Sequence, residues 1–316
     1  MKLLITARWD EDGLKGVEAA YPQVEFLVAK TPEEVVEKIA EAEVVFGWPD
    51  RAAILAGKKL RWVQAHSAGM DWLTGNTELI ESDLLVTNMG AAFAATMVEH
   101  SFAMLLSLTR GLRHFDATRQ RRQWPRPLGI QPVGLAGMTL GVIALGNVGR
   151  GIGAAGHAMG MQVIAVDANE VPIPDFVESF WRMDGIPELL RRSDVVMVSC
   201  PLTEETKGLL GRDMLGLMKP TSYLIVISRG GIVDEQSLVA MLREGRLAGA
   251  GLDVAEVEPP AADSGLWEAP NLVLTPHCSG VSNQTSQGCW DVLHENLGRY
   301  LAGKSLINKV DKRRGY

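Results

Sequence analysis

Cysteine is scarce in this chain. Its 316 residues include three cysteines, Cys200, Cys278 and Cys289, and no two of them stand in a CxxC spacing. An odd number without that spacing argues against a disulfide framework and against a zinc knuckle. Thiols without disulfide partners are typical of a reducing compartment, so we expect a cytoplasmic protein.

Long uninterrupted apolar runs are also missing. The longest candidate, residues 91–108, carries Glu99 and His100 in its middle. This segment therefore predicts a buried helix rather than a membrane span. The N-terminal MKLLITARWD has only a short apolar run before a charge and lacks the apolar core of a signal peptide. We expect no leader sequence and no membrane partner.

An excess of positive charge is absent as well. The formal net charge is −7, from 31 Lys and Arg against 38 Asp and Glu. A general affinity for nucleic acid or for an anionic surface is therefore not expected. One local basic cluster stands out, formed by Arg119, Arg121, Arg122 and Arg126.

Apolar residues are plentiful, at 47% of a chain whose length is typical of two domains. Short apolar runs alternate with segments of helix length. This alternation indicates α/β architecture, with parallel sheets covered by helices on both faces. The expected strands are 3–7, 24–28, 44–47, 62–65 and 84–87, followed by 139–144, 162–166, 195–199, 222–227, 250–253 and 272–274.

Three helices have clear signals. A helix is expected over 32–42, because Thr31 is suited to the N-cap and Pro32 to the first helical position. A long apolar helix is expected over 92–110. The last helix is expected over 283–302, ending before Gly303.

The segment 139–167 has the order of a dinucleotide-binding unit: a strand, a glycine-containing turn, a helix of small residues and a second strand. The N-terminus of such a helix offers free N–H groups and a positive dipole end to a pyrophosphate. Gly146 would let the backbone approach the phosphates, and Gly149 would let the helix pack closely on the strand. The expected contacts come from Gly146, Asn147, Val148 and Gly149.

The turn departs from the usual glycine pattern at its first position, where this chain has Ala144. Alanine is expected to hold the turn with a negative φ. Gly151, Gly153 and Gly156 lie in the presumed helix, where each glycine costs roughly 1 kcal/mol relative to alanine. That cost indicates that neighbouring groups pack very close to this helix.

Asp167 ends the second strand of this unit, 18 positions after Gly149. A carboxylate at this place accepts hydrogen bonds from the adenosine ribose hydroxyls. It would repel a 2′-phosphate, and Ala168 and Asn169 supply no adjacent arginine to bind one. We therefore expect NAD(H) to be preferred over NADP(H).

Strings in several parts of the chain resemble the D-isomer-specific 2-hydroxyacid dehydrogenase family, and the likeness extends over nearly the whole chain. The strings are VTNMG (86–90), VEH (98–100), CPLTEETKGLLG (200–211), ISRGGIVDE (227–235), GLDVAEVEP (251–259), LWEAPNLVLTPH (266–277) and ENLGRYLAGKSLINKVD (295–311). The resemblance implies two doubly wound parallel-sheet domains. A Rossmann NAD-binding domain (97–281) would be inserted in a flavodoxin-like substrate domain (1–96 plus 282–316).

The resemblance also implies a catalytic arginine, glutamate and histidine, which by motif fall on Arg229, Glu258 and His277. Reduction of a 2-oxo acid needs a cation for the carboxylate and a proton for the developing alkoxide. Arg229 suits the first task through its bidentate fork, and His277 suits the second because imidazole titrates near neutral pH. Glu258 would orient the imidazole ring.

Further contacts are implied by the same resemblance. Cofactor contacts are expected from Cys200, Pro201, Thr206, Ile227, Ser228, Arg229, Asp253, His277 and Gly280. Substrate contacts are expected from Arg229, from the loop that contains Ala68 and Gly69, and from Trp48 and Trp124. Trp124 lies in the basic segment, where family members carry a loop at a dimer seam, so a homodimer is expected.

The expected function is hydride transfer between NAD(H) and C2 of a small 2-oxo or D-2-hydroxy acid. No metal is expected, because the three catalytic groups supply cation and proton and no ligand cluster is apparent. Two alternatives stay open: an NAD-sensing binding protein of the corepressor type, and phosphite dehydrogenase. Glu258 argues against formate dehydrogenase, whose family members replace this glutamate.

Overall fold

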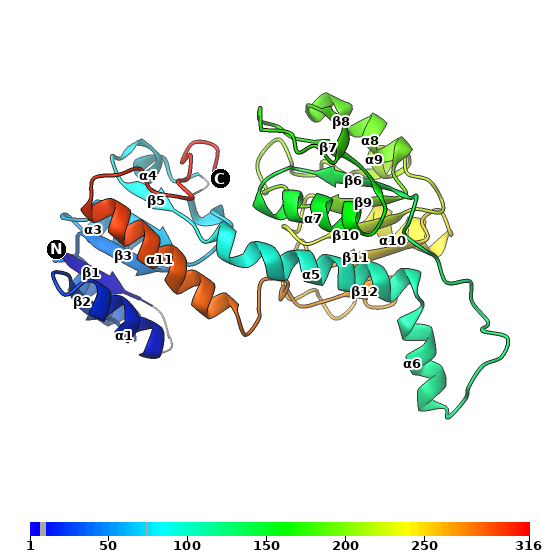
Figure 1. Cartoon of the computed structure of the whole chain (residues 1–316), viewed down its shortest axis with the longest axis horizontal. Coiled ribbons are helices and arrows are strands. Elements are labelled where there is room, and N and C mark those ends of the chain that lie inside the picture. Colours follow the sequence, from blue (N-terminus) through cyan, green and yellow to red (C-terminus); the bar gives the residue numbers. More distant parts are fainter. Residues whose placement is uncertain (7–10, 74) are drawn as a thin grey trace. The chain divides into compact units, whose positions relative to one another are not determined.

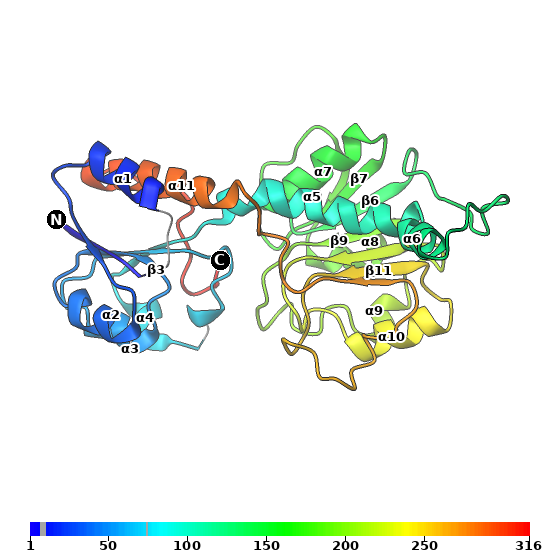
Figure 2. The same cartoon turned by 90° about the horizontal axis from the view of Figure 1, so that it is seen from below.

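The computed structural model describes residues 1–6, 11–73 and 75–316. They form two compact units, which Figures 1 and 2 draw in sequence colours. The first unit comprises Met1–Phe93 and Val281–Tyr316, and the second comprises Ala94–Gly280. The chain thus passes into the second unit after Phe93 and leaves it after Gly280, whereas the sequence places these crossings after residues 96 and 281.

The first unit contains a parallel five-stranded sheet with the strand order β2-β1-β3-β4-β5. Each of its strands lies where the apolar runs predict one. Residue 7, the last of the first expected strand, is outside the described residues. The strands are β1 (Lys2–Ile5), β2 (Glu25–Val28), β3 (Val44–Gly47), β4 (Trp62–Ala65) and β5 (Leu85–Thr87).

Helices cover both faces of this sheet, as Figure 2 shows. Because side chains alternate along a strand, Leu3 and Ile5 of β1 pack with α1 and α11, while Leu4 packs with α2, α3 and α4. The helices are α1 (Glu11–Ala20), α2 (Pro32–Ile39), α3 (Arg51–Ala56), α4 (Thr77–Glu81) and α11 (Thr285–Leu301), with a 3₁₀ turn over Asp71–Leu73.

The expected cap of α2 is confirmed. The Thr31 hydroxyl accepts a hydrogen bond from the backbone N–H of Glu34 at 3.3 Å, and Pro32 occupies the first turn. The helix ends at Ile39, three residues before the expected end, because the following residues turn into β3.

The second unit contains a parallel seven-stranded sheet with the order β12-β11-β10-β9-β6-β7-β8. Six of the strands were expected. The seventh, β8, was not expected: its VESFW run contains Glu178 and Ser179, and it lies at the sheet edge, where one strand neighbour suffices. The strands are β6 (Thr139–Ile143), β7 (Gln162–Val166), β8 (Val177–Trp181), β9 (Val195–Val198), β10 (Tyr223–Val226), β11 (Gly249–Leu252) and β12 (Leu272–Leu274).

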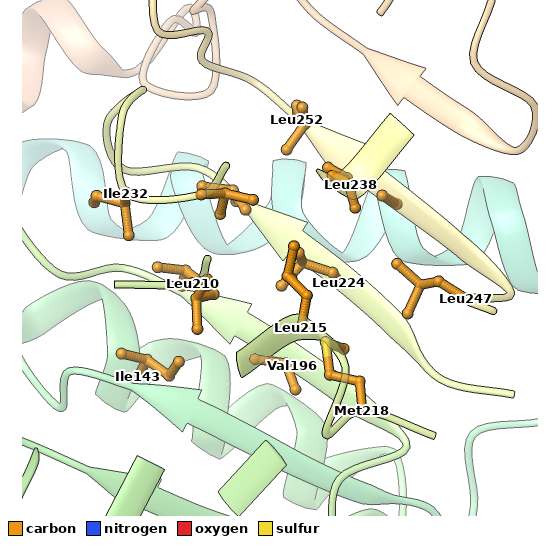
Figure 3. Packing of buried hydrophobic residues seen from close by; sticks show 14 of the residues in the cluster. Ile143, Val196, Leu210, Leu215, Met218, Leu224, Ile232, Leu238, Leu247 and Leu252 are labelled. Atoms are coloured by element: carbon orange, nitrogen blue, oxygen red, sulfur yellow. The ribbon is translucent and has the colours of Figure 1, made fainter. Parts of the chain in front are cut away.

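Two apolar layers sandwich this sheet. Ile225 of β10 packs on the face covered by α5 and α7, while Leu224 packs with Leu215 and Leu238 on the face covered by α8, α9 and α10 (Figure 3). The helices of this part of the chain are α5 (Gly90–Thr109), α6 (Leu112–Gln120), α7 (Asn147–Ala158), α8 (Ile186–Arg192), α9 (Arg212–Leu215) and α10 (Glu235–Arg243), with a 3₁₀ turn over Met183–Gly185. The fold is α/β, as expected.

Among the described residues, α5 alone is long and apolar enough to span a membrane by length and composition. Its second half packs on the sheet of the second unit through Phe102, Met104 and Leu105, which are nearly or fully buried. A core helix of a globular domain passes the same test of length and composition.

Candidate active site

The expected catalytic residues follow strands that end at the same, carboxyl edge of the second sheet. Arg229 follows β10, and His277 follows β12. Between them lies β11, which is followed by Asp253 and, a few residues later, by Glu258. Because parallel strands end at the same edge, residues far apart in the sequence meet there. Open α/β sheets place their ligand sites at this edge.

His277 and Glu258 form a direct pair. Imidazole Nδ1 lies 2.8 Å from Oε2 of Glu258, and the other carboxylate oxygen, Oε1, accepts from the N–H of Ala255 at 3.1 Å. The side chains are 43% and 39% exposed, so the pair is open to a ligand. With Nδ1 turned to the carboxylate, Nε2 is the nitrogen available for proton transfer.

A cavity of about 590 Å³ opens beside this pair, within the range of small-molecule sites. Its wall is mainly apolar, with Trp267 and Pro259 among the apolar members and Asp253, Glu258 and His277 as ionisable ones. The lining is Asp253, Val254, Ala255, Glu258, Pro259, Pro260, Trp267, Leu274, Thr275, Pro276 and His277.

Asp253 is fully buried at the end of β11. Its Oδ1 accepts from the N–H of Cys278 at 2.9 Å, and its Oδ2 accepts from the N–H of Ser279 at 2.8 Å. Burial alone would raise the pKa of this carboxyl group, but hydrogen bonds from Ser279, Thr275 and Cys278 outweigh it and lower the pKa below its ordinary value. Asp253 therefore fixes the backbone that follows His277.

The expectation for Ala144 was wrong. Its φ is +74°, in the left-handed region, rather than negative. The turn holds this conformation because Ala144 N–H donates to Val166 O at 2.9 Å and its carbonyl accepts from the Ser199 hydroxyl at 3.1 Å. An L-residue is strained here, and glycine is not.

The close packing expected around the glycines of α7 is confirmed. A Cβ at Gly149 would lie 1.9 Å from the carbonyl oxygen of Ala144. At the next three glycines it would meet apolar side chains: Val98 at 2.7 Å from Gly151, Phe176 at 2.8 Å from Gly153 and Leu140 at 2.4 Å from Gly156. Nothing lies within 4 Å of a Cβ at Gly146, so the N-terminus of α7 has space for a ligand.

Asp167 follows β7, as expected, and is 6% exposed. Its Oδ2 accepts from the N–H of Leu145 and its Oδ1 from that of Asn169, both at 2.7 Å. The carboxylate thus ties the glycine turn to the end of β7. A carboxylate has about four lone-pair sites, so these two bonds leave capacity for ribose hydroxyls.

Other residues expected at the cofactor differ in the burial and hydrogen bonding of their side chains. The Cys200 side chain is buried in the core, and burial raises its thiol pKa to about 12. The Thr206 hydroxyl donates to Pro201 O at 2.7 Å and so braces its own loop. Among the described residues, nothing hydrogen-bonds the buried hydroxyl of Ser228. A buried polar atom without a partner fits a position completed by a ligand, and together with the open N-terminus of α7 and the spare lone pairs of Asp167 it is compatible with a bound dinucleotide.

The residues expected at the substrate lie in both units. In the first unit, Ala68 and Gly69 follow β4. Their loop is fixed because Asn88 Nδ2 donates to Ala68 O at 3.0 Å and the Ser67 hydroxyl donates to Gly69 O at 2.8 Å. Trp48 follows the adjacent strand β3 and is 59% exposed. In the second unit, Trp124 lies beyond α6 and is 86% exposed.

Two residues of this site, His100 and Thr275, are not predicted from the sequence. His100 Nε2 lies 2.9 Å from the Thr275 hydroxyl, which donates to Asp253 Oδ1 at 2.6 Å. Both residues lie in family-like strings, VEH and LTPH, so the signal was present. Potential ligand atoms of His100, Asp253 and Cys278 lie within 4.8 Å of one another, a proximity that the sequence does not reveal.

A family model described as "D-isomer specific 2-hydroxyacid dehydrogenase, NAD binding domain" matches residues 102–279. The chain is 30% identical over 318 residues to a D-3-phosphoglycerate dehydrogenase of Methanocaldococcus jannaschii, covering 98% of this chain and 59% of that one. It is 32% identical over 287 residues to a glycerate dehydrogenase of Methylorubrum extorquens, covering 87% of each.

Solved structures agree. A D-isomer-specific 2-hydroxyacid dehydrogenase family protein of Aeromonas salmonicida gives a TM-score of 0.85 at 28% identity, covering 98% of this chain and 99% of that one. A family protein of Xanthobacter autotrophicus Py2, in complex with NADPH and MES, gives 0.82 at 27% identity, covering 100% and 99%. The chain belongs to the D-isomer-specific 2-hydroxyacid dehydrogenase family, and residues 102–279 match its NAD-binding domain.

Proposed function

We propose that the chain is an NAD(H)-dependent oxidoreductase that moves a hydride between the nicotinamide and C2 of a small 2-oxo or D-2-hydroxy acid. The observation that carries this proposal is the 2.8 Å pair of His277 and Glu258 beside a cavity at the carboxyl edge of the second sheet. Relatives named glyoxylate reductase and hydroxypyruvate reductase support small 2-oxo acids as the substrate class.

His277 is the proposed proton donor for reduction and the proton acceptor for oxidation. The bound nicotinamide supplies or accepts the hydride. Nε2 of His277 would give its proton to the oxygen on C2 as that oxygen gains charge. Glu258 accepts from Nδ1, so it would hold the ring in place.

Arg229 is the proposed binder of the substrate carboxylate and carbonyl. A guanidinium can grip a carboxylate with two parallel N–H donors and can stabilise a developing oxyanion. In the first unit, Ala68, Gly69 and Trp48 are the proposed substrate-binding residues. Trp124 is proposed to act across a homodimer seam in a cytoplasmic enzyme.

NAD(H) is the proposed cofactor because Asp167 would repel the 2′-phosphate of NADP(H). The pyrophosphate would lie at the N-terminus of α7, against Gly146, Asn147, Val148 and Gly149, as a dinucleotide does at such a turn. Pro201, Ile227, Ser228, Asp253 and Gly280 are proposed to complete the nicotinamide side of the site.

The test is NADH oxidation by wild-type protein with glyoxylate, hydroxypyruvate and aryl or branched 2-oxo acids. Turnover of at least one acid is expected, with a loss of at least about a hundredfold in His277→Asn, the usual scale for removing a general acid. His157→Asn, on the exposed side of α7, serves as the matched control and should keep wild-type activity. Absence of turnover despite NADH binding would contradict the proposal and favour an NAD-sensing protein, or a phosphite dehydrogenase if phosphite reduces NAD⁺.

A further inference from the structure

The backbone of His277 is strained. Its φ is +51°, a left-handed conformation that is unfavourable for an L-residue. Such a conformation persists only where the surrounding structure holds it. The direction of the imidazole ring therefore depends on the contacts that fix the chain on either side of His277.

Asp253 supplies those contacts. Its carbonyl oxygen accepts from the N–H of His277 at 2.7 Å, and its carboxylate takes the next two N–H groups, of Cys278 and Ser279. Three successive N–H groups thus point at one residue. The backbone of Asp253 holds His277 itself, and the Asp253 carboxylate holds the two residues that follow His277.

Two further side chains, those of Thr275 and His100, extend the hydrogen bonding of this carboxylate. The Thr275 hydroxyl donates its single hydrogen to Asp253 Oδ1 at 2.6 Å, so its oxygen can only accept at the 2.9 Å contact with His100. His100 Nε2 must therefore carry a hydrogen. The result is a directed chain of hydrogen bonds from α5 to the loop that carries His277.

We propose that His100 and Thr275 are positioning residues that act through Asp253 on the orientation of His277. The proposal deepens the proposed function, because it concerns the proton donor of the same site. A metal site formed by His100, Asp253 and Cys278 is disfavoured, because Oδ1 of Asp253 already accepts two hydrogen bonds. In addition, burial and the charge of Asp253 raise the pKa of the Cys278 thiol, which disfavours a thiolate ligand.

The first experiment needs no turnover. Cys278 is half-buried, whereas Cys200 and Cys289 are buried, so the alkylation rate of the native protein reports on the loop after His277. Thr275→Val and His100→Leu should loosen this loop and speed alkylation about tenfold, the factor expected for one lost hydrogen bond. Thr275→Ser and His100→Gln keep a hydroxyl and an N–H donor, so they should stay near the wild-type rate. Cys278→Ser should abolish the fast labelling.

The second experiment connects the loop to the reaction. Thr275→Val and His100→Leu should lower kcat about tenfold and leave KM for the 2-oxo acid within about twofold of the wild-type value. The conservative variants Thr275→Ser and His100→Gln should keep kcat near that of wild-type protein. Wild-type alkylation rates in both apolar variants would overturn the proposal, as would faster alkylation with unchanged kcat. If wild-type protein turns over no 2-oxo acid, the proposed function fails, and the alkylation series still decides whether this chain of hydrogen bonds holds the loop.

Discussion

Ala144 shows how a single residue can be strained at the centre of a binding turn. Its φ of +74° is natural for glycine and unfavourable for alanine. We predict that Ala144→Gly raises the free energy of unfolding by about 0.5–1 kcal/mol, because relief of strain exceeds the added entropy of the unfolded chain. Urea unfolding measures this change. Ala155→Gly, within α7, is the control and should lose about 1 kcal/mol; equal losses in both variants would contradict the account.

His66 is expected to make the free energy of unfolding sensitive to acid. Burial among aromatic rings, including Trp48 at 4.6 Å between ring centroids, lowers its pKa from 6.5 to about 4. Because the folded-state pKa is the lower one, this contribution is complete above pH 6.5. It is lost progressively as the pH falls towards 4, by up to about 3 kcal/mol.

The measurement is urea unfolding of wild-type protein and His66→Phe between these two pH values. The phenylalanine variant keeps an aromatic ring and cannot bind a proton, so its free energy of unfolding should fall less on acidification than that of wild-type protein. Parallel pH curves for the two proteins would contradict the predicted contribution of His66 to stability.

For single residues, the sequence predicts the chemical roles of side chains better than it predicts backbone conformation. Glu258 and His277 were assigned from motif and chemical role, and the structure brings them together at 2.8 Å. The positive φ values of Ala144 and His277 were not foreseen, because they follow from hydrogen bonds to residues distant in the sequence, Val166 and Asp253. His100 was missed for the same reason, since its partner Thr275 lies 175 positions away.

Among the elements, α7 carries the tightest packing constraint. A Cβ at Gly149 would collide with backbone, 1.9 Å from the Ala144 oxygen, whereas a Cβ at Gly16 in α1 meets nothing within 4 Å. We predict that Gly149→Ala weakens NADH binding at least about tenfold and lowers stability, while Gly16→Ala gains up to about 1 kcal/mol from helix propensity. Fluorescence titration and urea unfolding check the pair. Unchanged NADH affinity in Gly149→Ala would contradict the assigned role of this turn.

The element pattern followed from apolar periodicity wherever a strand is buried on both faces. β10, with YLIV, is fully buried and was anticipated. β8 was not, because edge position lets polar residues interrupt its run. Helix ends lie a few residues from the predicted ones, as in α2, which ends at Ile39.

For the whole molecule, cofactor choice calls for a direct test, because similar structures such as that from Xanthobacter autotrophicus contain NADPH. We predict that NADH raises the Tm of wild-type protein more than NADPH does at equal concentration, because a ligand stabilises the fold according to its affinity. Asp167→Ser should narrow or reverse the difference by removing the charge that opposes a 2′-phosphate. A larger Tm shift with NADPH in wild-type protein would contradict the NAD(H) preference.

The central claim is hydride transfer to C2 of a 2-oxo acid, and isotope transfer tests it most directly. Wild-type protein is incubated with NADH carrying deuterium at the transferable C4 position and with the fastest-reacting 2-oxo acid whose product is chiral at C2, which excludes glyoxylate. The product is analysed by mass spectrometry and on a chiral column. The account predicts one deuterium at C2 of the D-2-hydroxy acid. Product without deuterium at C2, or of the L configuration, would contradict it.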